Sequence, residues 1–112
     1  MGLGFGLHVE VDTGGQEPID VELGAFNITH NVSPMWVKAG VYDALYNSDG
    51  KDAGEVLETL REGKVDFIAD LNEYQELNPP NGWGTVKDAF GFLESVIALC
   101  EKHPKAKIWI SA

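Results

Sequence analysis

The N-terminal part of the chain alternates between apolar and polar residues in two separate runs. A period of two is typical of a strand with one face buried and the other in water. The apolar members of the first run, over residues 3–11, are Leu3, Phe5, Leu7, Val9 and Val11. Those of the second run, over residues 18–28, are Ile19, Val21, Leu23 and Ala25. The segment Asp12-Thr13-Gly14-Gly15 between them has the composition of a turn, so we predict a β-hairpin.

Three helices are predicted downstream, because apolar residues there recur at three- and four-residue steps. Their start signals are Ser33-Pro34, Asp52 with Glu55, and Thr85 with Asp88. Each start combines a capping side chain with proline or an acidic partner in the first turn. The expected ends are near Tyr46, near Leu71, and at His103-Pro104.

The apolar stripes of the last two helices define most of the expected core. The stripe of the second helix is Val56, Leu57, Leu60, Phe67, Ile68 and Leu71. That of the third is Val86, Ala89, Phe90, Leu93, Val96, Ile97 and Cys100. Residues 107–111 alternate again and are too short to stand alone, so they are expected to join the hairpin as a third strand. The prediction is one α+β domain over residues 1–112, with a three-stranded antiparallel sheet packed on three helices.

Charge and composition narrow the range of partners. The chain has 18 acidic and 8 basic residues, for a net charge of −10. Such a charge repels nucleic acid and anionic membranes, so neither is expected as a direct partner. No apolar run approaches the length of a membrane span and no signal peptide is recognisable, which favours a cytoplasmic protein. The lone Cys100 and three scattered histidines offer no metal site, and no cofactor is expected.

Two segments carry motifs instead of periodicity. One is Asn27-Ile28-Thr29-His30-Asn31 with Met35-Trp36 after it; the other is Asn78-Pro79-Pro80-Asn81-Gly82-Trp83-Gly84-Thr85. Together they resemble a family of small uncharacterised proteins common in phage and prophage genomes, and the resemblance runs from about Thr13 to Ala112. That family has no established chemistry, so the resemblance indicates where a site lies and not what it does.

Both motif segments lead into predicted helix starts and carry side chains suited to a ligand. Asn27, Thr29 and Asn31 fall on one face of an extended chain, about 6–7 Å apart. The residues expected to bind a ligand are Asn27, Thr29, His30, Asn31, Asn81, Trp83 and Thr85. In the structural alternative, Asn31 and Asn81 form turns and Trp83 covers the end of the core. If the segments share one pocket, they must lie together in the fold.

The resulting function prediction is a non-catalytic phage accessory protein that binds a small ligand. By analogy with small counter-defence proteins, the ligand would be a nucleotide-type host signal. No Ser/His/Asp or Cys/His set is apparent. Asp12-Thr13-Gly14 resembles the aspartic protease triplet, but the helical remainder of the chain argues against that class.

Two alternative functions rest on other features. The first is a protein inhibitor that imitates nucleic acid and occupies a basic host protein. It rests on a stripe of carboxylates along one continuous helix, Glu55, Glu58, Glu62, Asp66, Asp70 and Glu73. The second is a homo-oligomeric assembly factor, because Gly2, Gly4 and Gly6 leave one face of the first strand open to close contact.

Overall fold

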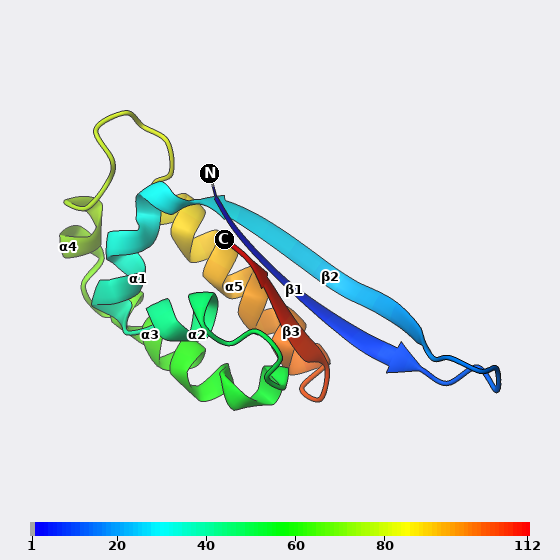
Figure 1. Ribbon diagram of the computed structural model, residues 1–112. Helices are drawn as coiled ribbons and strands as arrows, with labels where there is room; N and C mark the ends of the chain where they lie inside the picture. The colour runs from blue at the N-terminus through cyan, green and yellow to red at the C-terminus, as the bar shows by residue number, and fades with distance from the viewer. Residues whose placement is uncertain (1) are drawn as a thin grey trace.

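The computed structural model describes residues 2–112 and has its helices on one side of a three-stranded antiparallel sheet (Figure 1). The strands are β1 (Gly2–Val11), β2 (Ile19–Thr29) and β3 (Lys107–Ser111), in the order β2-β1-β3. The predicted α+β class, the hairpin and the third strand are confirmed. Strand β1 is central, so β2 forms one edge of the sheet and β3 the other.

A register shift in the hairpin changes which residues of β2 face the helices. Val21 pairs with Val9, but beyond the shift at Leu7 and His8 it is Phe26 that pairs with Phe5. A bulge of this kind moves the alternation by one position. Odd-numbered residues of β2 therefore face the helices before the bulge, and even-numbered residues after it. The prediction that Ala25 lies on the buried face was wrong: Ala25 is exposed, and Phe26 and Ile28 turn toward the helices.

Two of the three glycines of β1, Gly4 and Gly6, are covered by an aromatic side chain of the same molecule. A Cβ atom on Gly6 would lie 2.6 Å from Cζ2 of Trp109, and one on Gly4 would lie 3.5 Å from Cζ3 of the same ring. Only glycine lets the indole rest on the strand at this distance. The expected open face is therefore filled from within the chain, which removes the basis for an oligomer contact there.

The first predicted helix is two helices, because the chain turns at Gly40. Helix α1 (Ser33–Ala39) ends at Gly40, whose φ of 74° is left-handed and favours glycine. Helix α2 (Tyr42–Tyr46) follows at once. Ser33 is not the capping residue that the sequence predicted: its hydroxyl donates to the carbonyl of His30, the first residue of the 3-10 helix η1 (His30–Val32). Trp36 lies in the core.

The second predicted helix is also interrupted. The Asp52–Glu55 capping box is present, but it opens a 3-10 turn, η2 (Ala53–Glu55), before α3 (Leu57–Ala69) and α4 (Leu71–Gln75). The last two residues of the predicted apolar stripe do not reach the core: Ile68 lies near the end of α3, and Leu71 follows the break at Asp70. Ile68 and Leu71 are exposed, contrary to the prediction, and Tyr74 is buried instead.

The acidic residues of this region do not form one unpaired stripe. The ammonium group of Lys38 lies 3.2 Å from a carboxylate oxygen of Glu73, 3.3 Å from one of Asp70 and 3.8 Å from one of Asp66. These contacts raise the pKa of Lys38, the hydrogen bond to Glu73 most of all. Three of the six carboxylates are thus gathered around one cation that ties α4 to α1.

Helix α5 (Val86–Lys102) is the long helix under the sheet, and it begins as predicted. Thr85 and Asp88 form a reciprocal capping box. The apolar stripe is buried except for Phe90, which is half-buried, and Phe92 is a buried residue that the periodicity did not include. Burial raises the pKa of Cys100 to about 12. Among residues 2–112, none of the helices has both the length and the apolar character of a membrane span.

Candidate ligand-binding groove

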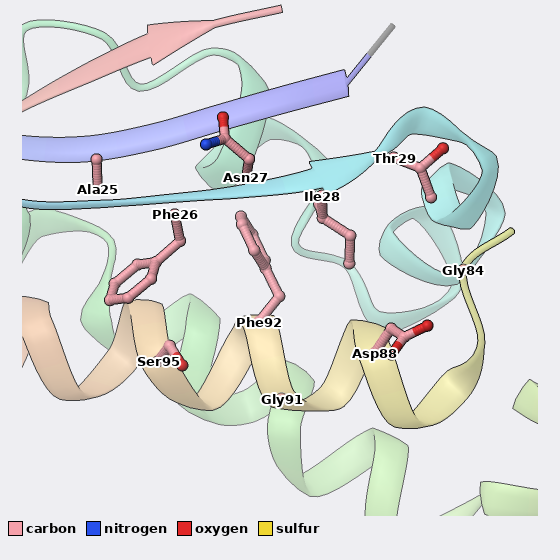
Figure 2. Close-up of a pocket in the computed structure, with 10 residues that line it drawn as sticks. All are labelled: Ala25, Phe26, Asn27, Ile28, Thr29, Gly84, Asp88, Gly91, Phe92 and Ser95. Atoms are coloured by element: carbon pink, nitrogen blue, oxygen red, sulfur yellow. The ribbon is translucent and has the colours of Figure 1, made fainter.

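A groove of about 640 Å³ runs between β2 and the first half of α5. Figure 2 shows the two elements facing each other, with Phe26 and Ile28 directed toward the helix and Phe92 directed toward the strand. The lining residues are Ala25, Phe26, Asn27, Ile28, Thr29, Gly84, Asp88, Gly91, Phe92 and Ser95. The groove is therefore apolar in its depth and polar along its rim.

The two motif segments meet at one end of this groove. Asn31 Nδ2 donates a long hydrogen bond, 3.4 Å, to the backbone oxygen of Trp83. Gly84 has a φ of 88°, and a Cβ atom there would lie 2.6 Å from Thr29 Cγ2 and 2.8 Å from Val32 Cγ1. Glycine is thus required at this position by both its conformation and its neighbours. The expected proximity of the two segments is present, and Asn27, Thr29 and Gly84 line one groove. The side chain of Asn27, however, points away from α5, so Asn27 borders the groove with its backbone (Figure 2).

Most of the polar side chains in the motifs are engaged in holding the loops. Thr29 Oγ1 accepts a hydrogen bond from Asn31 N at 3.3 Å. Asn81 Oδ1 accepts one from Trp83 N at 3.0 Å, which is the turn that the structural alternative predicted. Thr85 Oγ1 caps α5 by accepting from Asp88 N at 3.3 Å. Through these hydrogen bonds, the polar side chains of the two motif segments fix the backbone at the end of the groove.

Five of the seven expected ligand-binding residues are not among those that line the groove: His30, Asn31, Asn81, Trp83 and Thr85. His30 Nδ1 is 2.8 Å from the Tyr46 hydroxyl, and the two rings are stacked at 5.7 Å. Trp83 is 71% exposed in the loop between α4 and α5, so it does not cover the core as the structural alternative predicted. The turn before α1 is closed by Thr29, whose Oγ1 accepts from Asn31 N, while the Asn31 side chain donates to the Trp83 carbonyl.

The helix start at the groove is already supplied with acceptors from the chain itself. Asn78 Oδ1 accepts from Val86 N at 3.0 Å, and Asp88 Oδ2 accepts from Thr85 N at 3.1 Å. A helix N-terminus attracts anions, and here the carboxylate of Asp88 takes that place. Asp88 is also the one charged residue among those that line the groove. The electrostatics therefore favour a neutral or cationic ligand over a phosphate.

Several lining residues were not among those expected from the sequence. Phe26 and Phe92 form the apolar depth, and Gly91 leaves open space where a side chain would stand, since a Cβ atom there meets nothing within 4 Å. Apolar residues and glycines of this kind carry no polar group, so the sequence motifs do not mark them as ligand-binding residues. The available signal was Gly91 itself, a glycine in the middle of an otherwise regular helix.

Outside the groove, the structure supplies little further chemistry. Asp12 Oδ1 accepts from Gly14 N at 2.9 Å, which makes Asp12-Thr13-Gly14 a turn in an exposed loop. No group of three His, Cys, Asp or Glu residues suited to a metal ion occurs in the part of the chain that the structure describes. Comparison with protein-family models, with curated proteins and with solved structures gives no match. The groove is therefore the feature of this molecule that bears on its function.

Proposed function

We propose that this chain is a non-catalytic binding protein that takes its ligand in the groove between β2 and α5. The observation that supports this most is the convergence of the two motif segments on the groove, although Asn31 and Trp83 are 52 residues apart in sequence. Proline, glycine and capping side chains fix that end of the groove in advance, which lowers the entropic cost of binding. The resemblance of the motifs to small phage proteins supports an accessory role in the host cytoplasm.

The proposed ligand is neutral or positively charged. The net charge of −10 and the carboxylate of Asp88 at the groove both attract cations. A nucleotide-type signal carries phosphates, and no Lys, Arg or His lines the groove to receive them. The counter-defence role expected from the sequence is thus better served by a ligand without phosphate.

The inhibitor that imitates nucleic acid has weaker support. Such a protein needs aligned and unpaired carboxylates, whereas Asp66, Asp70 and Glu73 surround Lys38. Glu55 is also engaged, because its carboxylate accepts from Asp52 N at 2.8 Å. We therefore place the binding function at the groove.

Filling the groove from the helix side tests this proposal. Gly91→Leu puts a side chain into open space and replaces a poor helix former, so the variant should fold. In ¹⁵N-edited NMR spectra, neutral and cationic fragments should shift the amide signals of residues 24–29 and 84–95 of the wild type. Gly91→Leu should abolish these shifts, and Ala69→Leu, on the exposed surface of α3, should retain them.

Two results would contradict the proposal. One is binding by cyclic dinucleotides and adenine nucleotides only, with no response to neutral or cationic fragments. The other is a set of shifts that persists unchanged in Gly91→Leu, because the ligand would then lie outside the groove.

A further inference from the structure

The two edges of the sheet differ in whether another segment of the chain pairs with them. The edge of β3 is covered by the segment over residues 49–53. Gly50 N donates to the Ile108 carbonyl at 2.8 Å, Ile108 N donates to the Lys51 carbonyl at 2.9 Å, and Ile110 N donates to Asp49 Oδ1 at 2.7 Å. The outward-facing N–H groups of β3 are therefore paired. Within residues 2–112, β2 makes no backbone hydrogen bond outside its ladder with β1.

The register identifies which groups of β2 are left free. In antiparallel strands the N–H and C=O of one residue point to the same side, and the side alternates along the strand. The backbone N–H and C=O of Ile108 point away from β1. Those of its neighbour Trp109 therefore point toward β1, where Trp109 pairs with Gly6. The backbone groups of Gly6 thus point toward β3. Those of the adjacent Phe5 point toward β2, where Phe5 pairs with Phe26.

It follows that the neighbours of Phe26 direct their backbone groups away from the sheet. Ala25 and Asn27 present N–H and C=O at the free edge, and both residues line the groove. An edge strand with unpaired groups beside a groove is the arrangement to which an extended peptide adds as a further strand. In this arrangement the backbone supplies affinity, and alternate side chains enter the groove.

We propose that the ligand of the groove is an extended segment of another protein, bound as a fourth strand along residues 24–29 of β2. The inference rests on the proposed function and names the ligand class. Its backbone pairs with Ala25 and Asn27, and its inward side chains lie over Gly91 and Ser95 of α5. Both of these helix residues are small, which leaves room for the incoming side chains.

The distribution of charge along β2 marks the length of the docking segment. Asp20 and Glu22 stand on the outer half of the strand, and charged residues on an edge protect it from unwanted pairing. Residues 24–29 carry no charge and coincide with the groove. Six residues of strand span about 20 Å at ~3.3 Å each, so the proposed partner segment has about six residues.

The charge of the whole molecule favours a basic partner over a second copy. Pairing of two β2 edges would bring together two molecules of net charge −10. Like charges at this density oppose association, whereas a segment with Lys or Arg between its apolar residues is attracted. Asp88, exposed at the end of the groove, offers one such residue a direct partner.

The test uses a peptide of alternating Val and Lys with blocked ends as the probe, and fluorescence anisotropy as the measurement. Ala25→Pro removes an outward N–H that takes no part in the ladder, a position where an edge strand tolerates proline. It should weaken binding at least tenfold. Ala25→Val keeps the N–H and should bind as the wild type does. A peptide with Glu in place of Lys should bind at least tenfold more weakly.

A second measurement needs no change to the protein. Two versions of the probe, N-methylated on the odd or on the even residues, are titrated into the wild type. A strand pairs through only one of these sets, so one version should lose binding and the other should keep it. Equal binding by both versions would overturn the inference, as would a peptide-free dimer that Ala25→Pro dissociates, because the second copy would then occupy the edge.

These outcomes separate the two levels of the proposal. If fragments bind in a manner sensitive to Gly91→Leu and the peptides do not bind, the groove function stands and the strand inference fails. If neither fragments nor peptides shift the groove amides, both fail.

Discussion

The contact between Trp109 and the glycines of β1 predicts a measurable coupling between two distant positions. In Gly6→Ala the new methyl group would stand 2.6 Å from Cζ2 of the indole, so the ring must leave the strand. Inserting a methyl group into a packed site costs typically ~1–3 kcal/mol. Alanine also gains roughly 0.5–1 kcal/mol over glycine in a strand. The net loss in the free energy of unfolding is then about 0–2.5 kcal/mol.

The cost should vanish when the indole is removed. In a Trp109→Ala background, Gly6→Ala meets no ring and should stabilise by up to ~1 kcal/mol. The coupling energy between the two sites is thus about 1–3 kcal/mol, which lies within the range of residues in direct contact. Urea unfolding followed by far-ultraviolet circular dichroism measures all four proteins of the cycle without relying on tryptophan fluorescence.

One outcome would refute this reasoning. If Gly6→Ala changes the free energy of unfolding equally with and without Trp109, the ring does not rest on Gly6. The glycine would then be required for another reason, and the outer face of β1 would again be open to a partner.

The remaining predictions concern Tyr74 and Trp83. Burial, and then the hydrogen bond to Asp66, raise the pKa of Tyr74 above its ordinary value of 10.0. The resulting stability is present below pH ~10 and is lost at higher pH, because the unfolded chain releases the phenol proton first. Between pH 8 and pH 11, urea unfolding should therefore show a smaller loss of unfolding free energy in Tyr74→Phe than in the wild type. Equal losses would contradict this role of Tyr74. Trp83→Ala should change the free energy of unfolding by no more than ~0.5 kcal/mol, because the ring is 71% exposed; a larger loss would mean that the loop packs on the core.

The elements with strong local signals were predictable from the sequence. Alternation gave the hairpin, and the capping boxes of Asp52–Glu55 and Thr85–Asp88 are both present. These signals act within a few residues, so they do not depend on the rest of the fold. The class and strand content follow from them directly.

The predictions were wrong where the sequence pattern continues but the regular strand or helix is interrupted. The bulge in the hairpin shifts the alternation and exposes Ala25, although the sequence continues as before. Helix periodicity likewise runs through Asp70, but the helix is interrupted there. The carboxylate of Asp70 lies 3.3 Å from the ammonium group of Lys38. Asp70 and Lys38 are 32 positions apart in sequence, and periodicity contains no information about contacts of that kind.

The groove was predictable only in part. The motifs led to Asn27, Thr29 and the loop that contains Gly84, because proline, glycine and capping residues reveal a fixed backbone. They did not lead to Phe26, which the bulge turns toward the helix. The free edge of β2 is beyond any local pattern, since it depends on the strand order and on which segment covers β3.

The covered edge of β3 also limits how far these molecules can assemble. A sheet with two open edges can be extended by copy after copy, and an unprotected edge is the usual origin of such growth. Among residues 2–112, the segment 49–53 closes the outer edge of β3, and β2 keeps a free edge. Any strand that joins β2 completes the edge pairing of this molecule. Assembly through the sheet is therefore self-terminating: two copies joined edge to edge would have no further site, and a fibre of this fold cannot grow without first displacing that segment.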